Sequence, residues 1–209
     1  MMSGQYPKKL VVGISGASGV HLGIEFVRYL PSDIAVYVVI SNGAQCVYAN
    51  EPRDSHQTLE GALCEVRAHN LKIFSDEALH ECIASGSSRM EAMCIIPASC
   101  DVVAKIAMGV SDTLITRSAS VMLKEGRKLL LGVREMPFSA IMLENMLKLS
   151  HLGVCIAPPI VGYYGGAKSL EQMEQFFVGK WYDVLGIPHR LFTPWDDDAR
   201  QDVIKAAKQ

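Results

Sequence analysis

Glycines and serines follow the first apolar segment of the chain in a pattern that could bind an anion. Residues 9–15 are mostly apolar or small, and they lead into Gly16-Ala17-Ser18-Gly19. Glycines allow a tight turn and a close approach of the backbone to a ligand, and a helix that begins there offers unpaired N–H groups. A second loop of small residues, 98–101, follows the apolar segment 93–97. Side by side, the two loops would suit a phosphate on a polyol chain.

The glycine loop does not have the spacing of a nicotinamide dinucleotide site. It lacks the order G-x-G-x-x-G. The apolar segment 34–40 ends in Ser41-Asn42, where an NAD site would have an acid for the ribose hydroxyl. NAD is therefore disfavoured as a ligand, and a turn needed only for packing is the alternative explanation of the loop.

Charged side chains follow a later apolar segment. Arg134 and Glu135 come directly after residues 128–133, at the edge of the predicted sheet where ligands bind. Arg117 and the charged run 124–127 supply further cations, although such runs are commonly solvated. The pair 134–135 is therefore the stronger candidate for a site.

A loop rich in proline and glycine carries two tyrosines. Residues 158–166 read PPIVGYYGG, so prolines fix the start of the loop while glycines free its end. A tyrosine hydroxyl here could bind a ligand. Packing of one ring is the alternative.

The segments that carry these residues predict an α/β fold with an open, mostly parallel sheet. Residues 34–40 form a continuous apolar run, which is typical of a strand buried on both faces. Four other runs, at 9–15, 93–97, 128–133 and 154–157, predict further strands, with helical patterns between them, including one at 20–30. The clearest helix spans 169–185 with Ser169 as its N-cap, and residues 51–81 are expected to form a helix and loops.

Composition excludes several classes of function. With 20 Lys and Arg against 22 Asp and Glu, the chain lacks the basic character of a protein that binds nucleic acid or an anionic membrane. No apolar stretch approaches the ~20 residues of a membrane span, and the first residues do not form a signal peptide. The six cysteines and six histidines lack the spacing of a disulfide framework or a metal site. We therefore expect a single cytoplasmic domain over residues 1–209, with its core at 9–195 and a charged tail at 196–209.

Six motifs occur in the order found in one enzyme family. They are ISGASG at 14–19, SGS at 85–87, Arg117 with VMLKE at 121–125, VREMP at 133–137, LENML at 143–147 and PPIVGYY at 158–164. In this combination they resemble the UbiX/Pad1 flavin prenyltransferases, which belong to a flavodoxin-like flavoprotein superfamily that also includes cysteine decarboxylases. The resemblance covers residues 9–195, and it is far more specific than the glycine loop alone.

The resemblance implies a fold, an assembly and a reaction. The expected subunit is a three-layer, Rossmann- or flavodoxin-like open sheet with helices on both faces, in a homododecamer that binds FMN near subunit interfaces. The expected reaction joins a dimethylallyl group from dimethylallyl phosphate to N5 and C6 of reduced FMN, without a metal. The prenylated FMN would then serve a UbiD-type decarboxylase.

The motifs also imply roles for individual residues. The positions that match FMN-binding residues are Gly16, Ala17, Ser18, Ser41, Ser99, Cys100, Asp101, Val102 and Arg134. Those that match the dimethylallyl phosphate site are Tyr164 and Lys180, completed by Arg117 and Lys124. Ser18, Glu51 and Glu135 match residues that handle protons, and Trp195 matches an aromatic residue near the prenyl group. Fixed cations suit a leaving phosphate, and an aromatic pocket suits a developing allyl cation.

The chain departs from the family pattern at three places. Lys180 stands where many members have arginine, which keeps the charge but loses the forked contact to phosphate. The residues 100–102 replace a loop that carries Ser, Thr or Lys, and Asp101 would repel an FMN phosphate if it pointed inward. The segment 165–167 lacks the His-x-Pro that usually follows the tyrosine. Donor affinity and loop rigidity are expected to differ accordingly.

Two other functions remain open at the level of sequence. A cysteine decarboxylase would share Pro97-Ala98-Ser99, but Asp101 and Val102 replace the asparagine and threonine of that motif. A non-catalytic FMN-binding or flavin-delivery protein would retain the same loops. The acidic run 196–198 could suggest a magnesium-dependent diphosphate prenyltransferase, but it has no second acid cluster, and we interpret it as a solvated tail.

Overall fold

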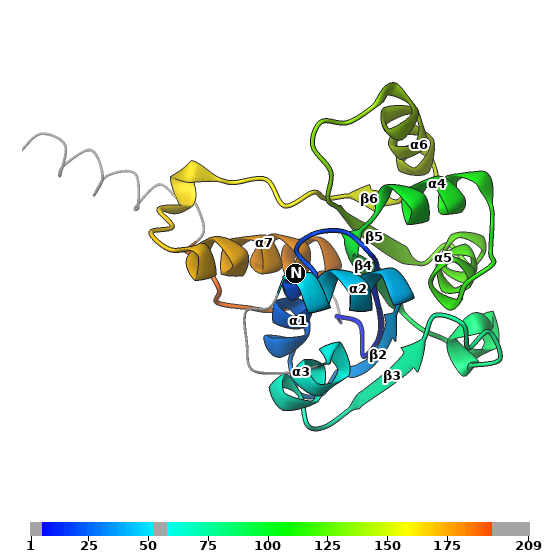
Figure 1. Ribbon diagram of the computed structural model, residues 1–209. Coiled ribbons are helices and arrows are strands. Elements are labelled where there is room, and N and C mark those ends of the chain that lie inside the picture. Colours follow the sequence, from blue (N-terminus) through cyan, green and yellow to red (C-terminus); the bar gives the residue numbers. More distant parts are fainter. Residues whose placement is uncertain (1–5, 52–57, 194–209) are drawn as a thin grey trace, which may run out of the picture.

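The computed structural model describes residues 6–51 and 58–193, in which six parallel strands form one sheet. The order of the strands across the sheet is β3-β2-β1-β4-β5-β6, and each neighbouring pair is parallel (Figure 1). The strands are β1 (Lys9–Ile14), β2 (Ala35–Ile40), β3 (Leu71–Ser75), β4 (Ala92–Ala98), β5 (Lys128–Val133) and β6 (Cys155–Ile156). This is the strand order of a Rossmann-type fold.

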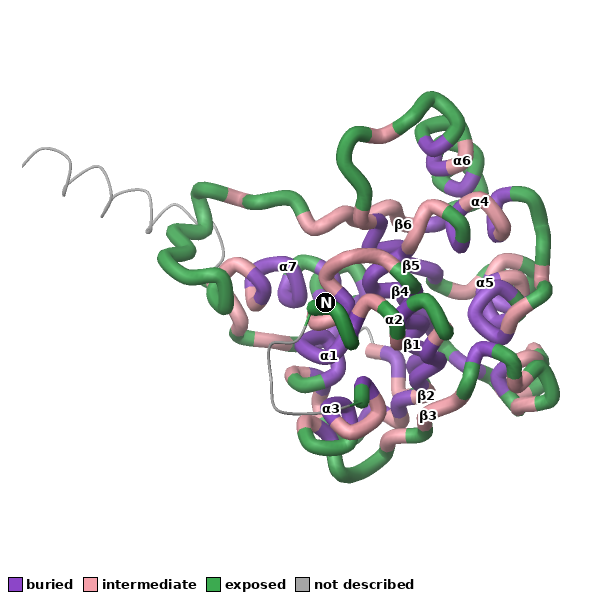
Figure 2. Tube along the Cα trace, viewed as in Figure 1, coloured by how far each residue is buried: buried purple, intermediate pink, exposed green. Residues whose placement is uncertain are grey.

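Helices cover both faces of the sheet and give the molecule three layers (Figure 1). One layer contains α1 (His21–Arg28), α3 (Leu59–Val66) and α7 (Leu170–Leu185), and the other contains α4 (Cys100–Met108), α5 (Leu114–Lys124) and α6 (Ala140–His151). The helix α2 (Asn42–Asn50) follows β2, and three short 3-10 helices lie at Cys82–Ala84, Gly86–Ser88 and Tyr163–Gly165. Figure 2 shows that the strands are buried between these layers.

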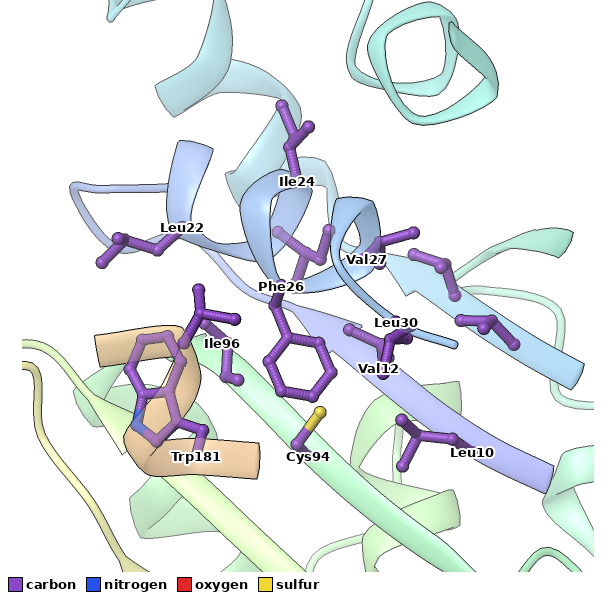
Figure 3. Packing of buried hydrophobic residues seen from close by; sticks show 14 of the residues in the cluster. Leu10, Val12, Leu22, Ile24, Phe26, Val27, Leu30, Cys94, Ile96 and Trp181 are labelled. Carbon is purple, nitrogen blue, oxygen red and sulfur yellow. The ribbon is translucent and has the colours of Figure 1, made fainter. Parts of the chain in front are cut away.

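Alternating side chains of the strands divide the interior into two cores. Leu10 and Val12 of β1 pack into the core beneath α1 and α7, whereas Val11 packs into the core beneath α4 and α5. Figure 3 shows the first core, where Phe26 of α1 points at the sheet beside Trp181 of α7. The indole N–H of Trp181 donates to the Ala157 carbonyl at 2.8 Å, so its polar atom is satisfied.

Most of the predicted elements are confirmed. Ser169 is the N-cap of α7, with its hydroxyl accepting the Gln172 N–H at 3.2 Å, and Phe177 and Trp181 on the predicted stripe are buried. The predicted strand at 154–157 is shorter, since only Cys155–Ile156 pairs with β5.

The prediction for residues 51–81 was wrong in one respect, because β3 lies within them. This strand forms the edge of the sheet and pairs with β2 alone. Lys72 and Ser75 are exposed, so the strand lacks the continuous apolar run by which the inner strands are recognised.

Gly23 lets α1 approach the sheet closely, and an added methyl group should destabilise the fold. A Cβ at this position would lie 2.6 Å from the Ile96 carbonyl oxygen, which is backbone. We expect Gly23→Ala to lower the free energy of unfolding by about 1–3 kcal/mol in urea denaturation. In the control Gly13→Ala, the new Cβ would meet the Ile95 side chain at 3.3 Å, which can shift, so the loss should be smaller. Equal losses in the two variants would contradict this account.

Candidate functional site

A cavity of about 680 Å³ lies beyond the carboxyl ends of the central strands. After β1 the chain crosses one face of the sheet, and after the neighbouring strand β4 it crosses the other face. The loops that follow β1 and β4 therefore diverge, and a crevice opens between them. The residues that line the cavity follow five of the strands or belong to the helices beyond them. They are Ser15, Gly16, Ala17, Ser18, Ser41, Asn42, Gly43, Asp76, Glu77, Ser99, Cys100, Asp101, Val102, Lys105, Asp112, Thr113, Thr116, Arg134 and Glu135.

Three helices present their N-termini to this cavity. Ser41 caps α2 by accepting the Ala44 N–H at 3.0 Å, and Ser99 caps α4 by accepting the Val102 N–H at 3.4 Å. Thr113 caps α5 in a reciprocal capping box with Thr116. The first N–H groups of α5 are already bonded, since Leu114 donates to the Asp76 carbonyl and Ile115 donates to the Asp76 carboxylate, both at 2.7 Å. The partial positive charge and N–H groups at the starts of α2 and α4 are therefore the ones that favour an anionic ligand.

Two glycines allow the first two loops of the cavity to touch. A Cβ on Gly16 would lie 2.9 Å from the Cα and the carbonyl carbon of Gly43, closer than real contacts of this kind. The absence of side chains therefore brings the loop after β1 against the start of α2. Small residues on both sides leave room for a ligand to approach the backbone.

Arg134 and Glu135 have separate partners at the end of β5. The Arg134 Nε donates to the Ser18 carbonyl at 3.1 Å, which ties β5 to the glycine loop. The Glu135 carboxylate accepts the Met136 N–H at 2.9 Å and faces the Cys100 thiol, with Sγ and Oε2 3.4 Å apart. The backbone bond from Met136, followed by the thiol, holds the pKa of Glu135 below its ordinary value. Burial and the neighbouring carboxylate raise the pKa of Cys100, so this thiol is a hydrogen-bond donor.

The opposite end of the cavity is acidic. Asp76 is buried and accepts the Ile115 N–H at 2.7 Å, while burial raises the pKa of its carboxyl. Asp101 and Asp112 both pair with Lys105, at 3.4 and 3.1 Å. Lys105 lies against the Asp101 carboxylate and therefore weakens the repulsion between Asp101 and a bound phosphate that the sequence suggested.

The structure brings all of the predicted FMN-binding residues together. All nine of them line the cavity, and so does Glu135, one of the predicted proton-handling residues. Glu51 does not line the cavity, but its carboxylate accepts the Gly19 N–H at 2.9 Å at the end of the loop after β1. Trp195 and the tail 196–209 lie outside the described residues.

Within one chain, the predicted donor residues do not meet. Tyr164 and Lys180 line shared cavities beside α7, whereas Arg117 lines a different one on α5, with its Nε donating to the Ala84 carbonyl. Lys124, also on α5, is exposed and lies 3.8 Å from Glu125. Because α5 and α7 cover opposite faces of the sheet, a single subunit cannot surround one phosphate with all four side chains.

Sequence reasoning missed several residues of the cavity, including Ser15, Asn42, Asp76, Glu77 and Lys105. Asp76 and Glu77 follow β3, so recognition of that strand would have directed attention to them. Lys105 lies one turn after Asp101, a spacing at which side chains on a helix pair.

Two kinds of feature are absent from residues 6–51 and 58–193. There, no three acidic, histidine or cysteine side chains lie close enough to hold a metal ion. No helix in the same ranges is long and apolar enough to cross a bilayer.

Comparison with known sequences finds a close match over most of the chain. A family model described as Flavoprotein matches residues 3–181. A protein of Helicobacter pylori named flavin prenyltransferase UbiX is 52% identical over 187 residues, which cover 90% of this chain and 98% of the relative.

Comparison with solved structures gives the same relationship. A dodecameric FMN-dependent UbiX-like decarboxylase from Escherichia coli O157:H7 has a TM-score of 0.83 and 33% identity, over 90% of this chain and 99% of that one. AnUbiX in complex with FMN and dimethylallyl pyrophosphate has a TM-score of 0.82 and 30% identity, over 91% and 98% of the two chains.

The contact between Cys100 and Glu135 predicts a change in acidity when the thiol is removed. A thiol that donates to the carboxylate favours its charged form, so Cys100→Ala should raise the pKa of Glu135 toward its ordinary value. The carboxyl carbon resonance of Glu135, followed by NMR against pH, would measure the change. Cys46→Ala, which alters an exposed thiol on α2, is the matched control. Identical titration curves for the two variants would show that the thiol does not act on Glu135.

Proposed function

Because the chain belongs to the flavoprotein family, and within it to the UbiX flavin prenyltransferases, we propose that its cavity binds reduced FMN and prenylates it. The dimethylallyl group of dimethylallyl phosphate is joined to N5 and C6 of the flavin, and phosphate leaves. The observation that carries the proposal is the convergence of the N-termini of α2 and α4 and the Arg134-Glu135 pair on one cavity, at the point where the strand order of the sheet reverses.

The small residues of the cavity hold FMN in this proposal. Gly16, Ala17 and Ser18 follow the central strand β1, with Ser41 after β2 on one side and the start of α4 at 99–102 after β4 on the other. Ser41 and Ser99 act mainly by capping, since each hydroxyl already accepts a backbone N–H and thereby fixes the helix N-terminus near the ligand. Arg134 adds a fixed cation beside the Ser18 carbonyl.

Glu135 is the proton acceptor in this proposal. FMN supplies the nucleophilic N5 and C6 atoms, and closure of the new ring releases a proton. The Glu135 carboxylate lines the cavity and is ionised at neutral pH, so it can accept that proton, although its lowered pKa makes it a weak base. Ser18 lines the same cavity, and Glu51 fixes the Gly19 backbone beside it, so both can assist the proton transfer.

The donor phosphate is held by residues from more than one subunit. Tyr164 and Lys180 supply one side of the donor site, and Arg117 and Lys124 of other subunits supply the rest of the positive charge. Trp195 is the proposed aromatic contact of the prenyl group. The E. coli neighbour is dodecameric, and we extend a homododecamer to this chain.

Exposed apolar side chains support such an assembly. Met136, Ile141, Ile160 and Tyr163 are exposed, and they lie after β5, on α6 and in the loop before α7. Figure 2 shows that this loop and much of α6 are exposed. A subunit interface over these segments would bury such side chains.

The product and the location complete the proposal. Prenylated FMN passes to a UbiD-type decarboxylase, and the protein acts in the cytoplasm as one domain. The six thiols are all unpaired, which suits a reducing compartment. Dimethylallyl phosphate is the proposed donor. Because AnUbiX was solved with dimethylallyl pyrophosphate, parallel assays with the phosphate and the diphosphate would decide between the two donors.

The first test concerns the phosphate of FMN. Because helix N-termini and Arg134 act on an anion, FMN should bind at least about tenfold more tightly than riboflavin, as expected for a charge-assisted contact. Fluorescence titration of the purified protein with each flavin, with and without a chelator, measures this. Binding should not depend on the chelator. Equal affinities for FMN and riboflavin would remove the argument for a phosphate cradle.

The second test concerns Glu135 and the reaction itself. Purified protein mixed with reduced FMN and dimethylallyl phosphate should yield the mass of a prenylated flavin. Glu135→Gln preserves shape but removes the proton acceptor, so single-turnover product formation should slow by about 10²–10⁴-fold. FMN affinity should stay nearly unchanged. A normal rate in the variant would assign Glu135 to structure, and FMN binding without product in the unaltered protein would favour the non-catalytic flavin-binding alternative.

A further inference from the structure

After α7 the chain folds back beside Lys180 and forms one wall of a second cavity. This open cavity of about 1020 Å³ is lined by Tyr164, Lys180 and Asp183 and by residues 187–193. It is distinct from the FMN cavity, with which it shares no lining residue. Its walls include both residues that we propose for the donor phosphate.

Asp183 links Lys180 to His189. Its Oδ2 lies 3.1 Å from the Lys180 Nζ, one turn earlier on α7, and its Oδ1 lies 3.0 Å from the His189 Nε2. A lysine and an aspartate at this spacing on a helix surface commonly form a weak, mobile pair. Here the second carboxylate oxygen is held from outside the helix, so the carboxylate is fixed at both oxygens.

The hydrogen bonds of His189 determine which ring nitrogen carries the proton. The Leu191 N–H donates to Nδ1 at 3.2 Å, so Nδ1 has no proton. The neutral ring therefore carries its proton on Nε2 and donates it to Asp183. The imidazole is thus a hydrogen-bond donor of fixed direction toward the carboxylate that holds Lys180.

Packing holds the imidazole in place. Its side chain is only 10% exposed, and its ring lies 5.2 Å from the Phe192 ring and 5.9 Å from the Tyr182 ring. Gly179 permits this packing, because a Cβ there would lie 2.5 Å from Phe192 and 2.9 Å from His189. Tyr182 belongs to the buried core, so His189 connects the Lys180 side chain to a rigid part of the molecule.

We propose that Asp183 and His189 are positioning residues for Lys180. His189 orients the Asp183 carboxylate, and Asp183 holds the Lys180 ammonium at the mouth of the cavity where the donor phosphate binds. This inference rests on the proposed function, since it assigns Lys180 to the donor. It predicts that loss of either partner weakens donor binding through Lys180 and leaves the FMN cavity unchanged.

Two variants of His189 separate its two hydrogen bonds. The amide oxygen of Asn can reach the position of Nδ1 and keep the Leu191 contact, whereas the amide nitrogen of Gln can reach the position of Nε2 and keep the Asp183 contact. Both variants remove the aromatic ring, and their Tm values report how much packing each one loses. The difference between His189→Asn and His189→Gln therefore reports on the contact to Asp183.

The experiment measures the KM for dimethylallyl phosphate, kcat, FMN affinity and Tm for these variants, alone and combined with Lys180→Ala. Lys180→Ala should raise the KM by about ten- to a hundredfold, as loss of a charge-assisted contact implies. His189→Asn should raise the KM by about three- to tenfold, and His189→Gln should remain closer to the unaltered protein. In the Lys180→Ala background the two His189 variants should have the same KM, because the residue through which they act is gone.

Three results would overturn the inference. Equal KM values for His189→Asn and His189→Gln would show that the Asp183 contact is irrelevant to the donor. A difference that persists in the Lys180→Ala background would show that His189 acts through another group. An imidazole that NMR shows to be protonated on Nδ1 would remove the donor to Asp183, and this measurement decides the point even if the protein forms no prenylated flavin. Failure to form product in the unaltered protein would instead overturn the proposed function.

Discussion

The candidate site depends on the side chain of Ser15, which links β1 to β4. These are the two neighbouring strands from which the chain continues to opposite faces of the sheet. The Ser15 hydroxyl donates to the Pro97 carbonyl at 2.8 Å and accepts the Ser99 N–H at the same distance. β1 and β4 are thereby joined at their carboxyl ends, just where one continues to α1 and the other to α4 on the opposite face. The loops that diverge from this point form the walls of the cavity, and Ser99, held by Ser15, caps α4 at its edge.

The central part of this arrangement could be predicted from sequence, because the inner strands are buried on both faces. Continuous apolar runs identify β2, β4 and β5, and the small or charged residues directly after them lie at the ligand-binding edge. The acidic end of the cavity could not be predicted, since Asp76 follows an edge strand whose exposed residues hide its pattern. The hydrogen bond from His189 to Asp183 also escapes sequence reasoning, because it depends on how the chain folds back over α7.

The charges of the FMN cavity explain why backbone groups matter so much there. Five carboxylates and two cations line it, so side-chain charge alone would disfavour a phosphate. Lys105 offsets Asp101 and Asp112, and Asp76 is buried against the N-terminus of α5. The N–H groups at the starts of α2 and α4, together with Arg134, are then the features that attract an anion.

The donor site differs from the FMN cavity, because Lys180 lies on a helix packed against the core and Tyr164 lies in an exposed loop. The helix α7 buries Trp181 and Tyr182 in the core. The adjacent Lys180 is linked to this core through the contacts of Asp183 and His189. Tyr164 instead lies in the exposed loop before α7 and is steadied by edge-to-face contact of its ring with Phe176, at 5.7 Å. In the proposed arrangement the donor phosphate would therefore contact one residue on the buried helix α7 and one tyrosine in an exposed loop. Assembly of subunits around the loop before α7 would order this loop. The same step would complete the donor site and bury the exposed apolar residues of the loop.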